Sequence, residues 1–212
     1  MVIRRKSSSK LIDISKLSYN EMESNGTVKT GNKLFSQGRI ALFLFSLTIL
    51  AMFVINVLPV PNSVSYIKEV SYPGALLPDT LFYYDSHRLY DTLESLGTSG
   101  REAYRTFLLT FDTVFPLLYS SALALSIWVL LRKAALRSTY AAKLYLLPLF
   151  AGLFDYIENM SMLVILSNYP ERLIVWPTIA GCLTSAKWLV SFISVTLLTF
   201  SAVLALWRSR SL

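Results

Sequence analysis

The sequence contains little charge and few metal-ligating side chains. Only 16% of its 212 residues are charged, and it has one cysteine and one histidine. A single cysteine excludes an intramolecular disulfide and any metal site built from several cysteines. A single imidazole likewise argues against zinc or di-iron cages, which need several histidines.

Nucleotide-binding and hydrolase motifs are also missing. The chain contains no GxGxxG, Walker A, HExxH or GxSxG pattern. We therefore expect no metal and no cofactor. The composition does not favour any named enzymatic activity, although it leaves an acid–base role for buried carboxyl groups open.

What the sequence has in abundance is apolar surface. Hydrophobic residues make up 54% of the chain, and the mean hydropathy is +0.51. Because roughly 20 apolar residues cross a bilayer as a helix, we predict an all-α polytopic membrane protein with a four-helix transmembrane bundle. The expected spans are residues 40–60, 104–131, 142–167 and 174–207, within a transmembrane domain at 39–208.

The net charge of +7 is explained by its distribution and does not indicate nucleic-acid binding. Fourteen lysines and arginines lie before the first span, between the second and third spans, or after the fourth, against five on the other side. This bias predicts that both termini are cytoplasmic, while the plasma membrane and endomembranes stay open. Residues 1–38 are basic and polar, which predicts a disordered tail. The first apolar run starts too late for a signal peptide, so we expect it to remain as an anchor.

An outer loop is expected at 61–103, and it should carry an amphipathic helix over 79–96. Asp79 is placed to cap the start of this helix and Gly97 to close its end. Such a helix would lie on the membrane surface or across the mouth of the bundle. Ser99 and Glu102 then form a capping box that predicts the start of the next helix near Gly100.

Ionisable residues within the expected spans provide the candidate site. Asp112, Asp155, Glu158 and Lys187 all fall roughly 12–20 Å below the outer helix ends, counted at 1.5 Å per residue. Charged groups inside a membrane are costly, so these four should face the bundle interior and contact one another.

Three further residues extend this cluster. Asn159 shares a helix face with Asp155 and Glu158, while Arg105 and Tyr119 lie seven residues before and after Asp112. Pro116 lacks a backbone N–H, which leaves the carbonyl of Asp112 without its usual partner. The candidate ligand-binding residues are Asp112, Asp155, Glu158, Asn159, Lys187, Arg105 and Tyr119.

Three carboxylates facing one ammonium leave an excess of negative charge. Either Arg105 reaches in as a second cation, or at least one carboxyl group is protonated, for which we favour Glu158 or Asp155. One interpretation is a pocket that binds or converts a lipid-like or amine-bearing small molecule. Another is an interhelical lock in an accessory or assembly subunit with a membrane-protein partner. A third is a proton-coupled transporter, which would need a homodimer because the halves show no inverted repeat.

Two stretches, "GTSGREAYRTFLLTFDTVFPLLYS" and "LFDYIENMSMLVILSNYP", resemble a loosely defined set of uncharacterised four-span membrane proteins. The resemblance covers about residues 97–190 and implies the fold alone. In layout the chain is also similar to sterol-isomerase and sigma-2-receptor-type four-helix bundles. That similarity implies acidic residues in a cavity for a cationic or carbocation-like lipid, without a residue-by-residue match.

Overall fold

A computed structural model describes residues 8–134 and 141–210 of the chain. The chain divides into two compact units, one up to Ile40 and the other from Ala41 onward. Helix α1 spans Ser8–Val57 and so overlaps residues 1–38, for which disorder stays a prediction. The stretch from Ser8 to Val57 contains no proline, and its helical hydrogen bonding is therefore not interrupted by a missing N–H.

Four helical stretches are long and apolar enough to span a membrane, as the sequence predicted. They are Lys33–Val57, Phe111–Lys133, Lys143–Asn168 and Val175–Arg210. The last three correspond to α5 (Phe111–Lys133), the 3-10 turn η2 (Ala141–Leu146) with α6 (Leu147–Asn168), and α7 (Val175–Arg210). The other described residues form shorter helices, turns and loops. The four long apolar helices together indicate an integral membrane protein. The cytoplasmic placement of the termini stays a prediction.

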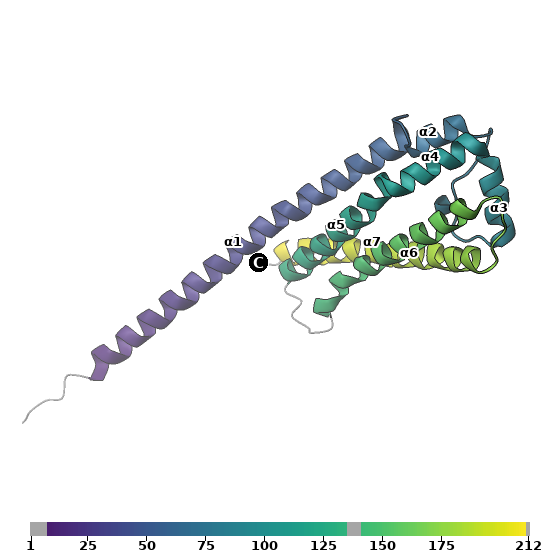
Figure 1. Ribbon diagram of the computed structural model, residues 1–212. Coiled ribbons are helices and arrows are strands. Elements are labelled where there is room, and N and C mark those ends of the chain that lie inside the picture. The colour runs from purple at the N-terminus through teal and green to yellow at the C-terminus, as the bar shows by residue number, and fades with distance from the viewer. Residues whose placement is uncertain (1–7, 135–140, 211–212) are drawn as a thin grey trace, which may run out of the picture. The chain divides into compact units, whose positions relative to one another are not determined.

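Helices α5, α6 and α7 pack against one another and form the centre of the second unit (Figure 1). The close approach of α5 and α6 depends on Gly152, where an added Cβ would lie 2.9 Å from the Ser120 hydroxyl and 3.1 Å from the Pro116 carbonyl. Small side chains permit such close packing in membrane helices.

The second predicted span, at 104–131, is interrupted. Helix α4 (Gly97–Leu109) ends at Thr110, whose φ of −115° and ψ of −85° lie outside the helical region, and α5 starts at the next residue. The Thr110 hydroxyl donates to the Thr106 carbonyl at 2.7 Å, and the Thr113 hydroxyl donates to the Leu108 carbonyl at 3.0 Å. These hydroxyls satisfy carbonyls at the end of α4, which explains how the break is tolerated among apolar residues.

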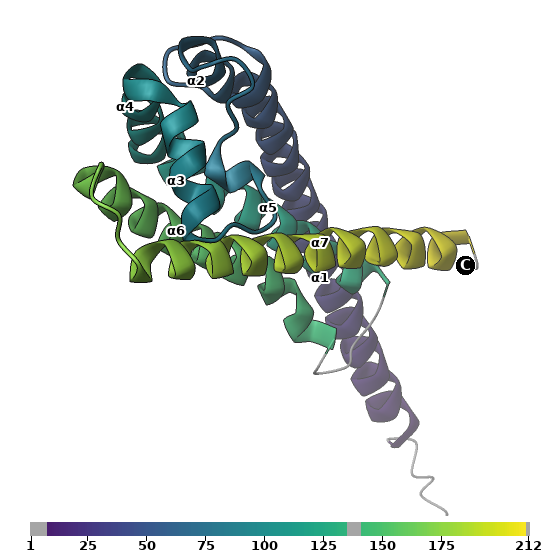
Figure 2. The same cartoon turned by 90° about the vertical axis from the view of Figure 1, so that its right-hand side faces the viewer.

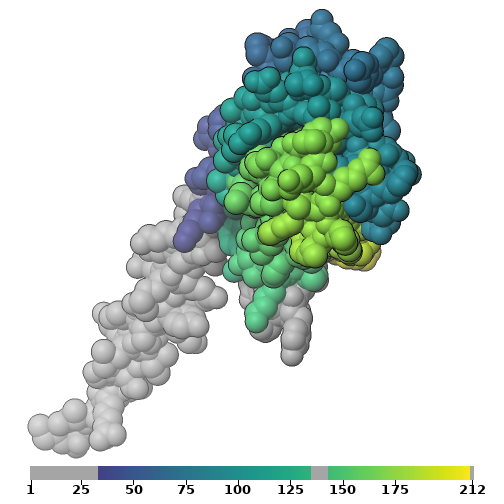
Figure 3. All heavy atoms as spheres, turned by 45° about the vertical axis from the view of Figure 1, so that its right-hand side comes forward, coloured from purple at the N-terminus to yellow at the C-terminus, as the bar shows by residue number. Residues whose placement is uncertain are grey.

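Residues 58–110, which we call the cap, fold at one end of α5, α6 and α7 (Figures 2 and 3). The cap contains α2 (Val64–Val70), the 3-10 turn η1 (Pro78–Thr80), α3 (Ser86–Ser95) and α4. The helix expected at 79–96 is therefore shorter than predicted. Its N-cap is Asp85, whose carboxylate accepts from the Arg88 amide at 2.8 Å, and Asp79 belongs to η1 instead.

The bend between α3 and α4 replaces the expected capping box. Helix α4 starts at Gly97 with φ +65°, a conformation that favours glycine, and Leu96 precedes it without a side-chain cap. Ser99 and Glu102 lie inside the first turns of α4. The bend at Gly97 changes the direction of the chain, so α4 begins three residues before the predicted start at Gly100.

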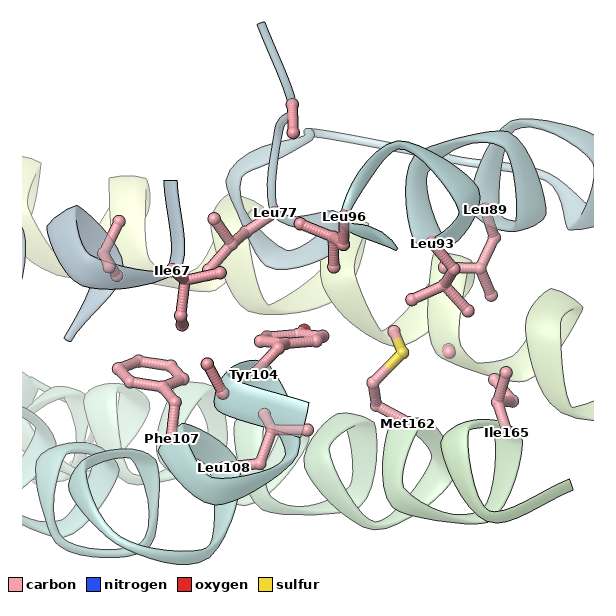
Figure 4. Packing of buried hydrophobic residues seen from close by; sticks show 14 of the residues in the cluster. Ile67, Leu77, Leu89, Leu93, Leu96, Tyr104, Phe107, Leu108, Met162 and Ile165 are labelled. Carbon is pink, nitrogen blue, oxygen red and sulfur yellow. The ribbon is translucent and has the colours of Figure 1, made fainter. Parts of the chain in front are cut away.

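The largest apolar core lies in the cap and not between the long helices. Figure 4 shows side chains of α2 and α3 facing those of α4 and of the adjoining end of α6. Ile67, Leu77, Leu89 and Leu93 are 0% exposed, and Met162 of α6 is 1% exposed. Burial of large apolar side chains stabilises by about 1.5–3 kcal/mol each relative to exposure in water. The cap therefore shares its core with the adjoining ends of the long helices, including Met162 and Ile165 of α6 and Ala180 of α7.

Candidate functional site

Lys187 of α7 lies at the centre of a buried ion-pair cluster. Its ammonium Nζ is 3.1 Å from Asp155 Oδ1 and 2.7 Å from Glu158 Oε2, both on α6. The side chains of Lys187, Asp155 and Glu158 are 10%, 7% and 1% exposed. Asp155 and Glu158 are three residues apart, so they share the face of α6 that packs against α7. The predicted meeting of these three residues is present in the structure.

Hydroxyl groups supply the remaining partners of the two carboxylates. Thr184 Oγ1, one turn before Lys187, donates to Glu158 Oε1 at 2.6 Å. Tyr119 of α5 donates from its hydroxyl to Asp155 Oδ2 at 3.2 Å. The Lys187–Glu158 contact is an ion pair that lacks good hydrogen-bond alignment. The cluster thus links α5, α6 and α7, and its paired charges need no solvent.

Tyr84 extends this hydrogen-bond network from α5, α6 and α7 into the cap. Its hydroxyl lies 3.2 Å from Thr184 Oγ1. Burial raises the pKa of Tyr84 far above its usual value, and the Glu158 carboxylate raises it further. The phenol therefore stays protonated and can donate to Thr184, whose own proton points to Glu158.

Asn159 and Asp112 meet at the backbone. Asn159 Nδ2 donates to the main-chain carbonyl of Asp112 at 3.1 Å. This is the carbonyl that Pro116, four residues later, deprives of its helical partner, so Asn159 replaces the missing N–H. The Asp112 side chain is 6% exposed. It is absent from the ion pairs of the described part of the chain.

Arg105 does not join the cluster, contrary to expectation. It is exposed on α4, and the ion pairs among the residues described do not include it. The reason is the break at Thr110: a seven-residue spacing keeps two side chains on one stripe only if the helix between them is continuous. Because α4 and α5 are separate helices, Arg105 and Asp112 lose that common face.

Asp79 is a residue of the candidate site that the sequence did not indicate. It lies in η1 and is half-buried as a residue, although its carboxyl group is enclosed by protein atoms beside Lys187 and Asp155. The Tyr104 hydroxyl is 3.5 Å from Asp79 Oδ1, and the Trp188 indole donates to the Asp79 carbonyl at 3.3 Å. No periodic signal marks Asp79, since its position follows from how the cap folds back on α7.

Burial raises the pKa of the Asp79 carboxyl group by more than the Lys187 ammonium lowers it. The Asp155 carboxylate raises this pKa further. The folded protein then holds a proton that the unfolded chain releases, so stability should fall as pH rises above the usual value of 3.8. We expect Asp79→Asn to have a higher melting temperature than wild type at pH 7, with the difference shrinking at pH 4. Thermal unfolding in detergent across this range measures it.

Glu94→Gln, which changes an exposed acid on α3, is the matched control. It should leave the melting temperature unchanged at both pH 7 and pH 4. A lower melting temperature for Asp79→Asn at pH 7 would instead mean that Asp79 is ionised and paired with Lys187.

A cavity of ≈ 410 Å³ lies beside the ion-pair cluster. Its walls come from α1, the cap, α5, α6 and α7, and most of them are apolar or aromatic, including Phe45, Ile49, Phe115 and Leu123. Asp79, Asp112, Asp155 and Lys187 also line it, whereas Glu158 and Arg105 do not. The site therefore combines an apolar chamber with carboxyl groups. Two of them, Asp79 and Asp112, have no cationic partner within ion-pair distance among the residues that the structure describes.

The arrangement suits hydrogen bonding and charge pairing more than metal binding. No group of three histidine, cysteine, aspartate or glutamate side chains among the described residues is placed to hold a metal ion. An ammonium group, by contrast, needs only one or two oxygen acceptors and tolerates aromatic neighbours.

Fold and site together define a class: an all-helical protein with four helices able to span a membrane, a buried lysine–carboxylate cluster and an adjoining acidic cavity. Comparison of the chain with protein families, curated proteins and solved structures finds no match.

Proposed function

We propose that this protein binds an amine-bearing small molecule with an apolar body in the cavity between its helices. The observation that carries the proposal is the cavity itself, ≈ 410 Å³ in volume, with the carboxyl groups of Asp79 and Asp112 on otherwise mainly apolar walls. Ligand pockets are commonly 300–1,000 Å³ and combine apolar walls with a few orienting polar groups. The volume and lining fit that description.

Charge balance supports a positively charged ligand. Four carboxyl groups, those of Asp79, Asp112, Asp155 and Glu158, surround the ammonium of Lys187. The two carboxylates of α6 already pair with it, so it is shared and leaves the other two acids uncompensated. Uncompensated carboxylates in apolar surroundings are costly, and they must bind a proton or a cation. A ligand ammonium would supply the missing charge.

Neighbouring residues of the ion-pair cluster and of the cavity wall have different roles. Glu158 and Thr184 are 1% and 0% exposed and face away from the cavity, so they act as the interhelical lock. Asp112 and Asp79 face the cavity and act as counter-ions for the ligand. Lys187 and Asp155 belong to both groups and fix the electrostatic potential of the cavity wall.

Aromatic side chains strengthen the case for an amine. Phe107, Phe115, Tyr119 and Trp188 all contribute to the cavity wall. An ammonium within about 6 Å of an aromatic face gains roughly 0.5–2 kcal/mol, more where water is excluded. An anionic ligand would gain nothing from these rings and would be repelled by the acids.

Asp112→Asn should lower the affinity for an alkylamine such as octylamine by tenfold or more, because loss of one buried charge partner costs about 2–5 kcal/mol. Isothermal titration of the detergent-solubilised protein measures the affinity, and native mass spectrometry shows whether a small molecule co-purifies. Asp91→Asn, an exposed acid on α3, is the matched control.

Equal affinity for wild type and folded Asp112→Asn would refute the counter-ion role. The accessory-subunit and dimeric-transporter interpretations stay predictions, since the exposed apolar faces of α1 and α7 would suit lipid as well as a protein partner.

A further inference from the structure

We infer that the ligand is a single-chain cationic amphiphile dissolved in the bilayer, and that it reaches the cavity sideways, between α1 and α7. This inference rests on the proposed function and specifies its ligand class and its access route. Three features carry it: the position of the acids toward one end of the cavity, the exposure of its two rims on α1 and α7, and the partial cover of its cap end.

The acids Asp79 and Asp112 lie toward one end of the cavity, where Ile55, Val64 and Phe107 also line it. Asn56, Asp79 and Asp112 line it at the cap end, where α1 ends and α5 begins. Phe45, Leu123 and Val195 line it at the other end. Asp112 and Leu123 are eleven residues apart on α5, which is about 16 Å at 1.5 Å per residue. A molecule with one charged end and one long apolar chain matches this order.

The rims on α1 and α7 are open, whereas the wall on α5 is closed. On α1, Ile49 and Met52 line the cavity yet are 55% and 47% exposed; on α7, Trp188 and Val195 are 43% and 50% exposed. The α5 residues Ala122 and Leu123 are 0% and 9% exposed. All four rim residues lie in helices long and apolar enough to span a membrane. The opening therefore faces the side of the helices that lipid would occupy.

Contacts between residues 79–84 and α7 cover part of the cap end. The Ser185 hydroxyl donates to the Phe82 carbonyl at 3.0 Å, and the Trp188 indole donates to the Asp79 carbonyl. Gly181 approaches the Tyr84 carbonyl so closely that a side chain there would overlap it. We call residues 78–84 the latch. The latch narrows this end without sealing it, because Asn56 and Thr80 line the cavity and are exposed. An amine dissolved in the membrane would avoid the latch by entering between α1 and α7.

Trp188 provides a local reporter for the test. A variant with Trp128, Trp176 and Trp207 replaced by phenylalanine keeps Trp188 as its one tryptophan, and it is reconstituted in phosphatidylcholine vesicles. A dodecylamine brominated on its chain should quench Trp188, and free dodecylamine should reverse the quenching. At equal free aqueous concentration butylamine should be weaker by more than a hundredfold, because each methylene contributes about fourfold. Dodecanol should compete at least tenfold less well than dodecylamine.

The access route is tested by the rate of quenching. Ile49→Phe narrows the α1 rim and should slow quenching severalfold with the same final extent. Leu50→Phe makes the same kind of change at an exposed α1 position outside the cavity and should leave the rate unchanged. Equal rates for the two variants would overturn the lateral route.

The remaining outcomes separate the two proposals. Competition by butylamine as effective as that by dodecylamine would overturn the amphiphile inference and leave the proposed amine site standing. Quenching by the bromoamine that Asp112→Asn leaves unchanged, or no quenching in a folded protein, would overturn both.

Discussion

Lys187→Met is expected to destabilise the protein by about 3–5 kcal/mol, because it leaves the carboxylates of Asp155 and Glu158 buried without a cation. Hydrogen bonds between membrane helices often contribute only about 0.6 kcal/mol, so the loss of the bonds themselves is a small part of this effect. The unpaired charges dominate. Thermal unfolding in detergent and titration with a denaturing detergent measure the loss. Lys143→Met, at an exposed position, should change stability little.

The triple variant Lys187→Met/Asp155→Asn/Glu158→Gln separates charge from packing. Removing all three charges takes away the uncompensated carboxylates, so much of the stability lost in Lys187→Met should return. Replacement of buried ion pairs by neutral groups of similar shape is often nearly neutral. If the triple variant is as unstable as Lys187→Met alone, then the methylene stem of Lys187, and not its charge, holds α6 and α7 together.

Gly181→Ala is expected to have the second-largest effect, a loss of about 1–3 kcal/mol together with release of the latch. An added Cβ would overlap the backbone carbonyl of Tyr84, and backbone cannot rotate away as a flexible side chain can. The hydrogen bonds of Ser185 to Phe82 and of Trp188 to Asp79 should weaken as the latch moves.

Hydrogen exchange gives the local readout for Gly181→Ala. Amides of residues 79–84 should exchange faster than in wild type, while those of α5 and α6 should keep their protection. Cys182→Ala, a change at the adjacent exposed position, is the control. Unchanged exchange over the latch, with the protein folded, would show that the contact between Gly181 and Tyr84 is not what holds the latch against α7.

Lys187→Met and Gly181→Ala should affect ligand binding as well as stability. Lys187 and Asp155 belong both to the buried lock and to the cavity wall, so ligand binding and helix packing are coupled through the same charges. A ligand ammonium near Asp112 would therefore stabilise the folded protein in proportion to its affinity. Gly181→Ala should act differently, because it loosens the latch while leaving the charges in place.

Local pattern was sufficient to predict the long helices and the ion-pair cluster. Apolar runs identify a helix that can span a membrane whatever its neighbours are, because backbone groups in lipid must pair within the helix. Three- and four-residue spacing places Asp155 and Glu158 on one face, and counting along antiparallel helices brings Lys187 to the same depth. Pro116 indicated an unpaired Asp112 carbonyl, and Asn159 supplies the partner.

Tertiary structure decided the rest. The break at Thr110 removes Arg105 from the stripe that contains Asp112, and nothing in the helical period of residues 104–131 indicates it. Asp79 reaches the cavity because the cap folds back on α7, and the cavity itself exists only where five parts of the chain meet. Helical periodicity is a property of neighbours in sequence and can be read from the chain directly. The position of a loop residue depends on contacts between distant residues, which only the folded structure fixes.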